Sequence, residues 1–240
     1  MTPEKVAVVA VIYEEPEWTE TERLLDKLNC PKFFVDRKGS GSLAKALNSG
    51  FRQWIQGRNG ELHFEYVWFV TNVLFNETCL NTLVRVMDSS LFAGITPAFM
   101  SDNYACRPGP GRTGLAKCPY IEFTAPIVRA DVFKKFPLDE DMPYWGHDLD
   151  WGHRVRKEGH ALGVFYGEEL GHTYIRNTRL THRVTRRRLM NRRATNGETR
   201  VALIKKYGYD WKRVLCYTSK QKRNGSQQIH LVWEFILQNG

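Results

Sequence analysis

The chain has 240 residues, of which 42% are hydrophobic and 12% aromatic, a composition that is typical of one packed domain and excludes a disordered chain. No run of about 18 apolar residues occurs, so the sequence predicts no membrane-spanning segment. The net charge of +9 is uneven, because residues 171–240 hold 16 Lys and Arg against 3 Asp and Glu (+13), which leaves 19 against 23 (−4) in residues 1–170.

The cysteines and the N-terminus predict a cytoplasmic, soluble protein. Five cysteines, an odd number at no metal-ligand spacing, are interpreted as reduced thiols. A bridge between Cys106 and Cys118 across a Gly- and Pro-rich loop is the less favoured alternative. Residues 1–5 lead directly into an apolar run and lack the layout of a signal peptide.

The N-terminal part alternates between strand and helix patterns. Residues 6–13 form a continuous apolar run, which predicts a strand that is buried on both faces of a parallel sheet. Residues 19–22 fit a capping box that opens a helix with Leu24, Leu25 and Leu28 on its apolar stripe. Residues 33–36 predict a second strand ending at Asp36. The order implies a right-handed parallel unit, with Asp36 at the edge where such sheets bind ligands.

The next elements continue this alternation as far as residue 96. Residues 37–42 are a loop, and residues 43–55 have helical periodicity despite Asn48 and Gly50. These two residues are interpreted as part of an element whose polar side chains face a ligand, with a close helix–sheet contact at Gly50 as the alternative. Residues 66–75 predict the central strand, 79–89 a helix and 92–96 another strand. Residues 101–119 are expected to be irregular, and residues 121–128 to form a further strand.

The segment 142–160 carries two acids, Asp148 and Asp150, at the start of a predicted helix that reaches about residue 156 and ends at Gly159. Taken alone, two carboxylates in a first turn are interpreted as stabilising the helix N-terminus. A strand over 161–166 follows. A helix is predicted at 198–207, ended by Gly208, and the aromatic residues beyond it are expected to pack back on the same domain, without a second core.

Residues 125–141 and 145–159, together with His172, resemble the second half of a family 2 glycosyltransferase. His147 stands where the family has the first acid of its motif, and Asp148 and Asp150 match the second and third acids. The resemblance implies a single α/β domain of the GT-A type with a mostly parallel central sheet. Residues 1–175 would form the catalytic domain, with a donor half (1–97) and an acceptor half (98–175), and residues 176–240 a basic extension packed on it.

The resemblance also implies a nucleotide-sugar donor bound at the carboxyl edge of the sheet, with Asp36 binding the nucleoside. Thr71 and Asn72 align with the family's pair of metal-binding aspartates, and an amide is a poorer ligand for Mn²⁺ or Mg²⁺ than a carboxylate. The divalent cation is therefore expected to be weak, held mainly elsewhere, or absent, with Asn72 and His172 as candidate ligands near Asp148. The expected donor-binding residues are Tyr13, Asp36, Lys45, Asn48, Thr71 and Asn72.

For the reaction, the resemblance implies inversion at the sugar carbon, with Asp148 as the base that takes the proton of the acceptor hydroxyl. Asp150 would orient Asp148, bind the acceptor or cap the helix, so both are candidate catalytic residues.

Eight arginines lie between Gly171 and Gly197 with no acid among them, which indicates either a solvated basic face or a nucleic-acid contact. The acceptor is accordingly expected to be a hydroxymethylated DNA base or a saccharide. A non-catalytic sugar-nucleotide-binding or nucleic-acid-binding relative is the alternative. The candidate acceptor- or polyanion-binding residues are Trp145, His147, Arg183, Arg186, Arg187 and Arg188.

Overall fold

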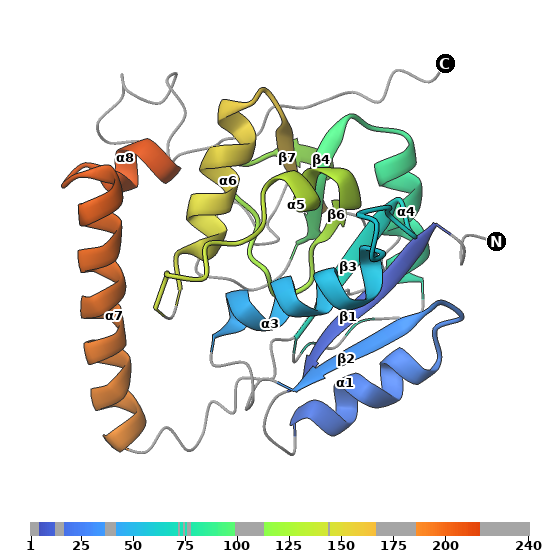
Figure 1. Cartoon of the computed structure of the whole chain (residues 1–240), viewed down its shortest axis with the longest axis horizontal. Helices are drawn as coiled ribbons and strands as arrows, with labels where there is room; N and C mark the ends of the chain where they lie inside the picture. Colours follow the sequence, from blue (N-terminus) through green and yellow to red (C-terminus); the bar gives the residue numbers. More distant parts are fainter. Residues whose placement is uncertain are drawn as a thin grey trace.

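The computed structural model describes residues 5–12, 17–36, 42–71, 73, 75, 78–98, 113–143, 145–166 and 186–216 (Figure 1). Its centre is a seven-stranded sheet in the order β2-β1-β3-β6-β4-β7-β5. The strands are β1 (Val6–Ile12), β2 (Lys32–Asp36), β3 (Tyr66–Val70), β4 (Phe92–Pro97), β5 (Gly114–Lys117), β6 (Ile127–Arg129) and β7 (Ala161–Tyr166).

The sheet is mostly parallel, as predicted. β1 pairs in parallel with β2 and with β3, where Val6 lies opposite Tyr66, and β4 pairs in parallel with β7. β6 is antiparallel to both β3 and β4, so β4 runs in the same direction as β3. Only β6 and the edge strand β5 therefore oppose the other strands. The α/β class expected from the alternating apolar patterns is confirmed.

Helices flank this sheet. They are α1 (Glu17–Asp26), α3 (Leu43–Gly50), the π-helical turn η1 (Phe51–Ile55), α4 (Cys79–Asp88), α5 (Ala130–Lys135), α6 (His147–Lys157), α7 (Arg186–Tyr207) and α8 (Trp211–Cys216). α3 contacts β1 and β2, α4 contacts β4, α5 contacts β6, and α6 contacts β7. The last two helices, α7 and α8, pack on α6 rather than on the sheet. Within the described ranges, no helix combines the length and the apolar character that a bilayer crossing requires.

Three local predictions were wrong. α1 begins at Glu17, so residues 19–22 lie inside the helix, and the buried Thr21 hydroxyl instead bonds both backbone groups of Val73 at 3.1 Å. Residues 121–126 are not a strand, because Pro126 has no N–H to donate and the ladder begins only at Ile127. Within the stretch expected to be irregular, β5 forms by pairing with β7, whose edge would otherwise be open.

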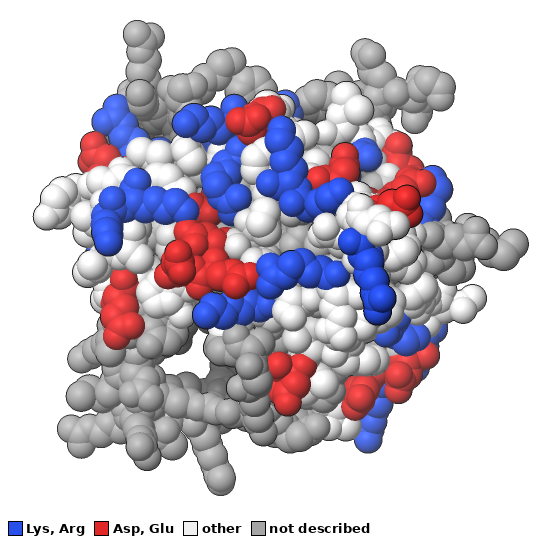
Figure 2. All heavy atoms as spheres, viewed as in Figure 1, with Lys and Arg blue, Asp and Glu red and all other residues white. Residues whose placement is uncertain are grey.

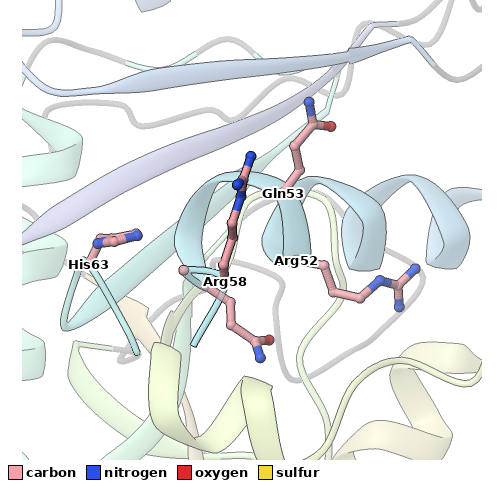
Figure 3. Close-up of a pocket in the computed structure, with 6 residues that line it drawn as sticks. Arg52, Gln53, Arg58 and His63 are labelled. Atoms are coloured by element: carbon pink, nitrogen blue, oxygen red, sulfur yellow. The ribbon is translucent and has the colours of Figure 1, made fainter. Parts of the chain in front are cut away.

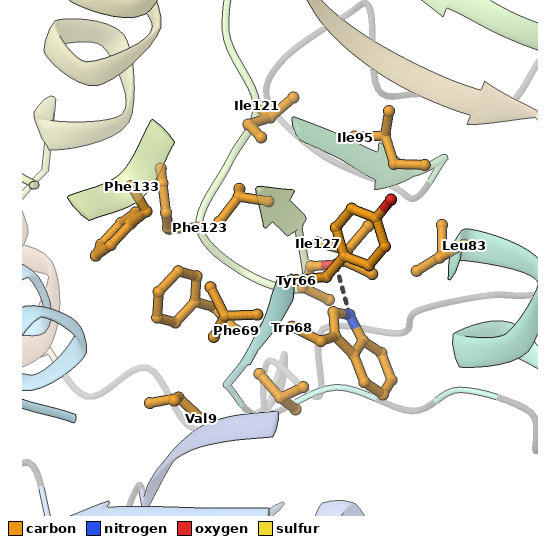
Figure 4. Packing of buried hydrophobic residues seen from close by; sticks show 14 of the residues in the cluster. Val9, Tyr66, Trp68, Phe69, Leu83, Ile95, Ile121, Phe123, Ile127 and Phe133 are labelled. Atoms are coloured by element: carbon orange, nitrogen blue, oxygen red, sulfur yellow. Dashed lines mark hydrogen bonds between the residues drawn. The ribbon is translucent and has the colours of Figure 1, made fainter. Parts of the chain in front are cut away.

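The main core is aromatic and lies around β3 (Figure 4). Phe69 packs against Phe123 and Phe133, with ring centroids 5.7 and 4.6 Å apart. The buried indole of Trp68 donates a hydrogen bond to the carbonyl oxygen of Ala125 at 2.9 Å. These contacts hold residues 123–125 against the carboxyl end of β3, and this end is where the candidate site is built.

A second, smaller cluster joins α6 to α7 and α8, contrary to the expectation of one core. α7 is longer than predicted, because the arginine-rich segment extends the helix back to Arg186. Gly208, with φ of 79°, ends α7 as expected. The domain boundary predicted at residue 175 falls outside the described residues and stays a prediction. The buried members of this second cluster are Met142, Leu149, Leu203, Trp211 and Leu215.

Gly50 should be intolerant of substitution, because α3 lies directly on the sheet there. A Cβ at this position would be 2.7 Å from Val9 Cγ1 and 2.8 Å from Val35 Cγ2. Gly50→Ala should therefore lower the free energy of unfolding by about 1–3 kcal/mol, although alanine is the better helix former. The neighbouring, exposed Ser49→Ala is the control and should be neutral or slightly stabilising. Urea unfolding of both variants measures this, and equal stability would contradict the close contact.

Candidate active site

The N-terminus of α6 lies beside the carboxyl end of β3. Thr71, which follows β3, donates its backbone N–H to the carbonyl oxygen of Thr124 at 3.0 Å and its hydroxyl to the same oxygen at 3.2 Å. The neighbouring Phe123 packs against His147, the first residue of α6, with ring centroids 6.4 Å apart. Residues 123–124 therefore connect the end of β3 with the first residue of α6, two segments that the sequence separates by about 75 residues.

Asp148 is a half-buried carboxylic acid that has no cationic partner among the residues the structure describes. One carboxylate oxygen accepts the backbone N–H of Leu149 at 2.9 Å. Burial raises the pKa of Asp148 to about 6, and the hydrogen bonds from backbone N–H groups of residues 146, 148 and 149 offset this effect only in part. At neutral pH, Asp148 is a carboxylate in surroundings that favour its protonated form, as a general base requires.

Asp150 has the opposite environment, because its fully buried carboxylate is surrounded by donors. It accepts from Arg154 Nε at 2.7 Å, from Lys206 Nζ at 2.6 Å and from the Tyr207 hydroxyl. Although burial disfavours its charge, the hydrogen bonds from Lys206, Tyr207 and Arg154 hold the pKa of Asp150 below its ordinary value. Two of the three donors come from α7, so this carboxylate joins α7 to α6.

The chain enters α6 through a glycine that α7 covers. Gly146 has φ of 91°, and a Cβ there would lie 3.3 Å from Thr199 Cγ2 and 3.4 Å from Leu203 Cδ1. The ring of the preceding Trp145 packs against Trp211 at 6.1 Å. The indole N–H of Trp145 is buried, and no group among the described residues accepts a hydrogen bond from it. Neither aspartate caps the helix from the N-cap position, which belongs to Gly146.

On the donor side, the structure gives Asn48 a structural contact. Its side-chain amide donates to the carbonyl oxygen of Leu138 at 2.8 Å and to Glu140 Oε1 at 2.9 Å, and its oxygen accepts the N–H of Leu138 at 3.0 Å. The buried Asn48 thus ties α3 to residues 138–140. Lys45 on α3 is exposed, and Asp36 is exposed at the carboxyl end of β2, at the edge predicted to hold the donor.

Several predicted site residues lie outside the described residues. They are Tyr13, Asn72, His172 and Arg183. Arg186, Arg187 and Arg188 form the first turn of α7, and only their backbone is described.

The described residues do not form a conventional cation site. No group of three or more His, Cys, Asp or Glu side chains among them could hold a metal ion. Cys30, Cys79 and Cys118 are free thiols, and burial raises the pKa of Cys79 and of Cys118 to about 12.

A hollow of about 560 Å³ lies away from Asp148, at the end of η1 (Figure 3). Its side chains diverge rather than converge on one point: Arg52 points away from Arg58 and His63 (Figure 3). Arg52 is also paired with Glu140 at 3.1 Å. On the face seen in Figure 2, basic side chains spread over the region of α3, α5, α6 and the end of α7, around an acidic patch.

Sequence reasoning missed the residues that hold the site in place. Thr21, Lys206 and Tyr207 are remote in sequence from the acidic motif, and their role depends on partners that only the fold supplies. The sequence offered one signal. Lys206 and Tyr207 stand immediately before Gly208, the residue that ends α7.

No protein-family model matches the chain, and no curated protein matches it in sequence. Similar solved structures include residues 1–349 of TarS from S. aureus, at 16% identity and a TM-score of 0.48, covering 67% of this chain and 58% of that one. TarS in complex with UDP-GlcNAc is 14% identical with a TM-score of 0.48, covering 88% and 70%. GalNAc-T7 with UDP, GalNAc and Mn²⁺ is 10% identical with a TM-score of 0.47, covering 67% and 42%.

The chain thus spans less than two thirds of the first TarS structure. The GT-A-like class expected from the sequence and membership of family 2 stay predictions.

Replacing Asp148 and Asp150 by asparagine should change the free energy of unfolding in opposite directions. Because the folded pKa of Asp148 lies above its unfolded value of about 3.9, the linked stability is present below about pH 4 and is lost as the pH rises through 6. Asp148→Asn should therefore raise the free energy of unfolding at pH 8, by up to about 3 kcal/mol, and change it little at pH 4.

The folded pKa of Asp150 lies below its unfolded value, so its stabilising contribution is present above about pH 4 and is lost in acid. Asp150→Asn should cost about 3 kcal/mol at pH 8, since it leaves Arg154 and Lys206 short of a partner. Denaturant melts of both variants at the two pH values measure this contrast. A loss of stability in Asp148→Asn at pH 8 would show that its carboxylate is structural.

Proposed function

We propose that this protein is an inverting glycosyltransferase that moves a hexosyl or pentosyl group from a nucleotide sugar to an acceptor hydroxyl. The observation that carries the proposal is the contrast between two acids that are two residues apart in the first turn of α6. Asp150 pairs with Arg154 and Lys206 and accepts a hydrogen bond from Tyr207, while Asp148, at the start of the same helix, has no cationic partner among the described residues and a raised pKa. A carboxylate that the fold keeps unpaired and near neutral pKa has the properties of a catalytic base.

In the proposed reaction, Asp148 accepts the proton of the acceptor hydroxyl as its oxygen attacks the anomeric carbon. The bond from that carbon to the diphosphate breaks on the opposite face, which inverts the configuration, and the nucleoside diphosphate leaves with the bonding electrons. Asp150 acts as a positioning residue, because its contacts with α7 hold the first turn of α6 in place. Asp36, Lys45 and Thr71 are proposed on the donor side, together with Tyr13 and Asn72.

The proposed acceptor is a hydroxymethylated DNA base or a saccharide. Trp145 and His147 flank Gly146 next to Asp148 in the chain and are proposed on the acceptor side. The arginines of the first half of α7, with Arg183 before it, favour the DNA base, because they would neutralise backbone phosphates. A base in duplex DNA would have to be turned out of the stack to reach Asp148.

A non-catalytic binding relative is the second candidate, and His147 in place of the first acid of the motif favours it. The two candidates differ in one measurement. A transferase consumes the nucleotide sugar when a matching acceptor is present. A binding relative is stabilised by the nucleotide sugar against thermal unfolding and releases no nucleoside diphosphate with any acceptor.

Asp148→Asn should lower the transfer rate by at least about 100-fold while leaving donor affinity nearly unchanged, because the base acts on the acceptor. For the wild type, kcat/KM should be level above pH 7 and fall about tenfold per pH unit below 6, the pKa of Asp148. Nucleotide release with hydroxymethylated DNA and with saccharide acceptors measures the rate. Asp131→Asn, an exposed acid on α5, is the control. A variant that keeps more than about a tenth of the activity would show that Asp148 is not the base.

The cation prediction concerns position 72. If Thr71 and Asn72 match the metal-binding pair of the family, Asn72→Asp should tighten binding of Mn²⁺ in the presence of nucleoside diphosphate, because a carboxylate is the better ligand. Electron paramagnetic resonance of Mn²⁺ measures the affinity without requiring turnover, and Asn81→Asp on α4 controls for the added charge. An unchanged Mn²⁺ affinity would contradict this alignment.

A further inference from the structure

The junction of α7 and α8 forms a small basic and aromatic hollow of about 510 Å³. Gly208 ends α7, its N–H bonding the carbonyl oxygen of Ile204 at 2.7 Å, and the N–H of Trp211 bonds the carbonyl oxygen of Gly208 at 3.1 Å to start α8. The hollow is therefore built on a hydrogen-bonded turn rather than on a loose loop. Its side chains include three cations, two aromatic rings and one acid: Arg200, Lys212, Arg213, Tyr209, Trp211 and Asp210.

The three cations of this hollow are not neutralised. Other basic side chains of the protein pair with acids: Lys206 contacts Asp139 and Asp150 at 2.5 and 2.6 Å. By contrast, Arg200, Lys212 and Arg213 form no ion pair with any of the residues that the structure describes. Their charge is thus available to an anionic ligand.

An exposed aromatic ring stands among these cations. The side chain of Tyr209 is 89% exposed, whereas Trp211 is buried against the second core cluster and lies 5.5 Å below the ammonium group of Lys212. Trp211 anchors the turn, and Tyr209 presents its ring to the solvent. A free aromatic face beside unpaired cations suits a ligand that has both a flat ring and phosphates, and an unpaired nucleotide has both.

Beyond the hollow, the backbone of α7 carries a stripe of arginine positions. Arg186, Arg193 and Arg200 recur every seven residues, which places them on one side of the helix. At 1.5 Å per residue they span about 21 Å. The side of α7 that carries these arginines is adjacent to the side that packs at the start of α6 through Thr199 and Leu203. α7 is one unbroken helix at the outer side of the molecule (Figure 1), with eight Lys or Arg and one Glu.

We propose that the hollow at the α7–α8 junction and this stripe form a binding site for single-stranded nucleic acid. One base stacks on Tyr209, Arg200, Lys212 and Arg213 contact the adjoining phosphates, and the strand continues along α7. A duplex offers phosphates but no free base face, so the aromatic ring favours a single strand. This inference goes beyond the proposed transferase activity, because binding requires neither a nucleotide sugar nor Asp148.

Fluorescence anisotropy of a labelled oligothymidylate of about 15 nucleotides tests the site with the full chain, without a nucleotide sugar, between about 50 and 200 mM salt. Tyr209→Ala should weaken binding roughly 5- to 150-fold, the range for one stacked base, and Tyr209→Phe should stay within about twofold of the wild type. Arg200→Ala combined with Arg213→Ala should reduce the log–log salt slope by roughly 1.4, about 0.7 for each phosphate contact.

Lys205→Ala is the matched control. It also removes an exposed charge from α7, but from a position about 120° around the helix from the side where Arg200 and Ile204 line the hollow. This variant should bind the oligothymidylate with an affinity within about twofold of that of the wild type. Unchanged binding by Tyr209→Ala, equally tight binding of a duplex of the same length, or an equal effect of Lys205→Ala would each overturn the site. Asp148→Asn should bind the strand as the wild type does, so a failure of this site and a failure of the transferase proposal are separate results.

Discussion

The arrangement of the site depends on one buried carboxylate. Asp150 is fully enclosed and binds Arg154 of its own helix together with Lys206 and Tyr207 of α7. A buried charge is tolerated only when its hydrogen bonds are satisfied, so α7 cannot leave α6 without exposing Asp150 or leaving it unpaired. The same contact brings Thr199 and Leu203 onto Gly146 and closes the small core around Trp211.

The contacts of Asp150 with α7 explain how Asp148 and Asp150 acquire different chemistry. Positions 148 and 150 are about 200° apart around a helix, so one can be buried under α7 while the other is directed elsewhere. Asp150 receives all the cationic partners, and Asp148 receives only backbone N–H groups, which leaves its pKa raised to about 6. The separation of the two pKa values follows from the position of α7, and it assigns the acid–base role to Asp148 and the positioning role to Asp150.

α7 has two separate tasks along its length. Its C-terminal end supplies packing and hydrogen bonds to α6, while its N-terminal half carries arginines at a density that packing on the domain does not require. Because a continuous helix is stiff, whatever binds the arginines is held at a fixed place relative to the N-terminus of α6. The turn at Gly208 adds Tyr209 to the same side as Arg200, so the aromatic and basic groups meet at the point where α7 is anchored.

The sequence by itself determined the alternation of strands and helices, because buried runs such as residues 6–12 and helix ends such as Gly159 and Gly208 are local signals. It also singled out Asp148 and Asp150. It misplaced the start of α1 and missed β5 and the first half of α7, since arginines lack an apolar pattern although they favour helix. Only the tertiary structure decided which aspartate is paired and that Asn48 ties α3 to residues 138–140, because burial and hydrogen-bond partners come from residues distant in the chain.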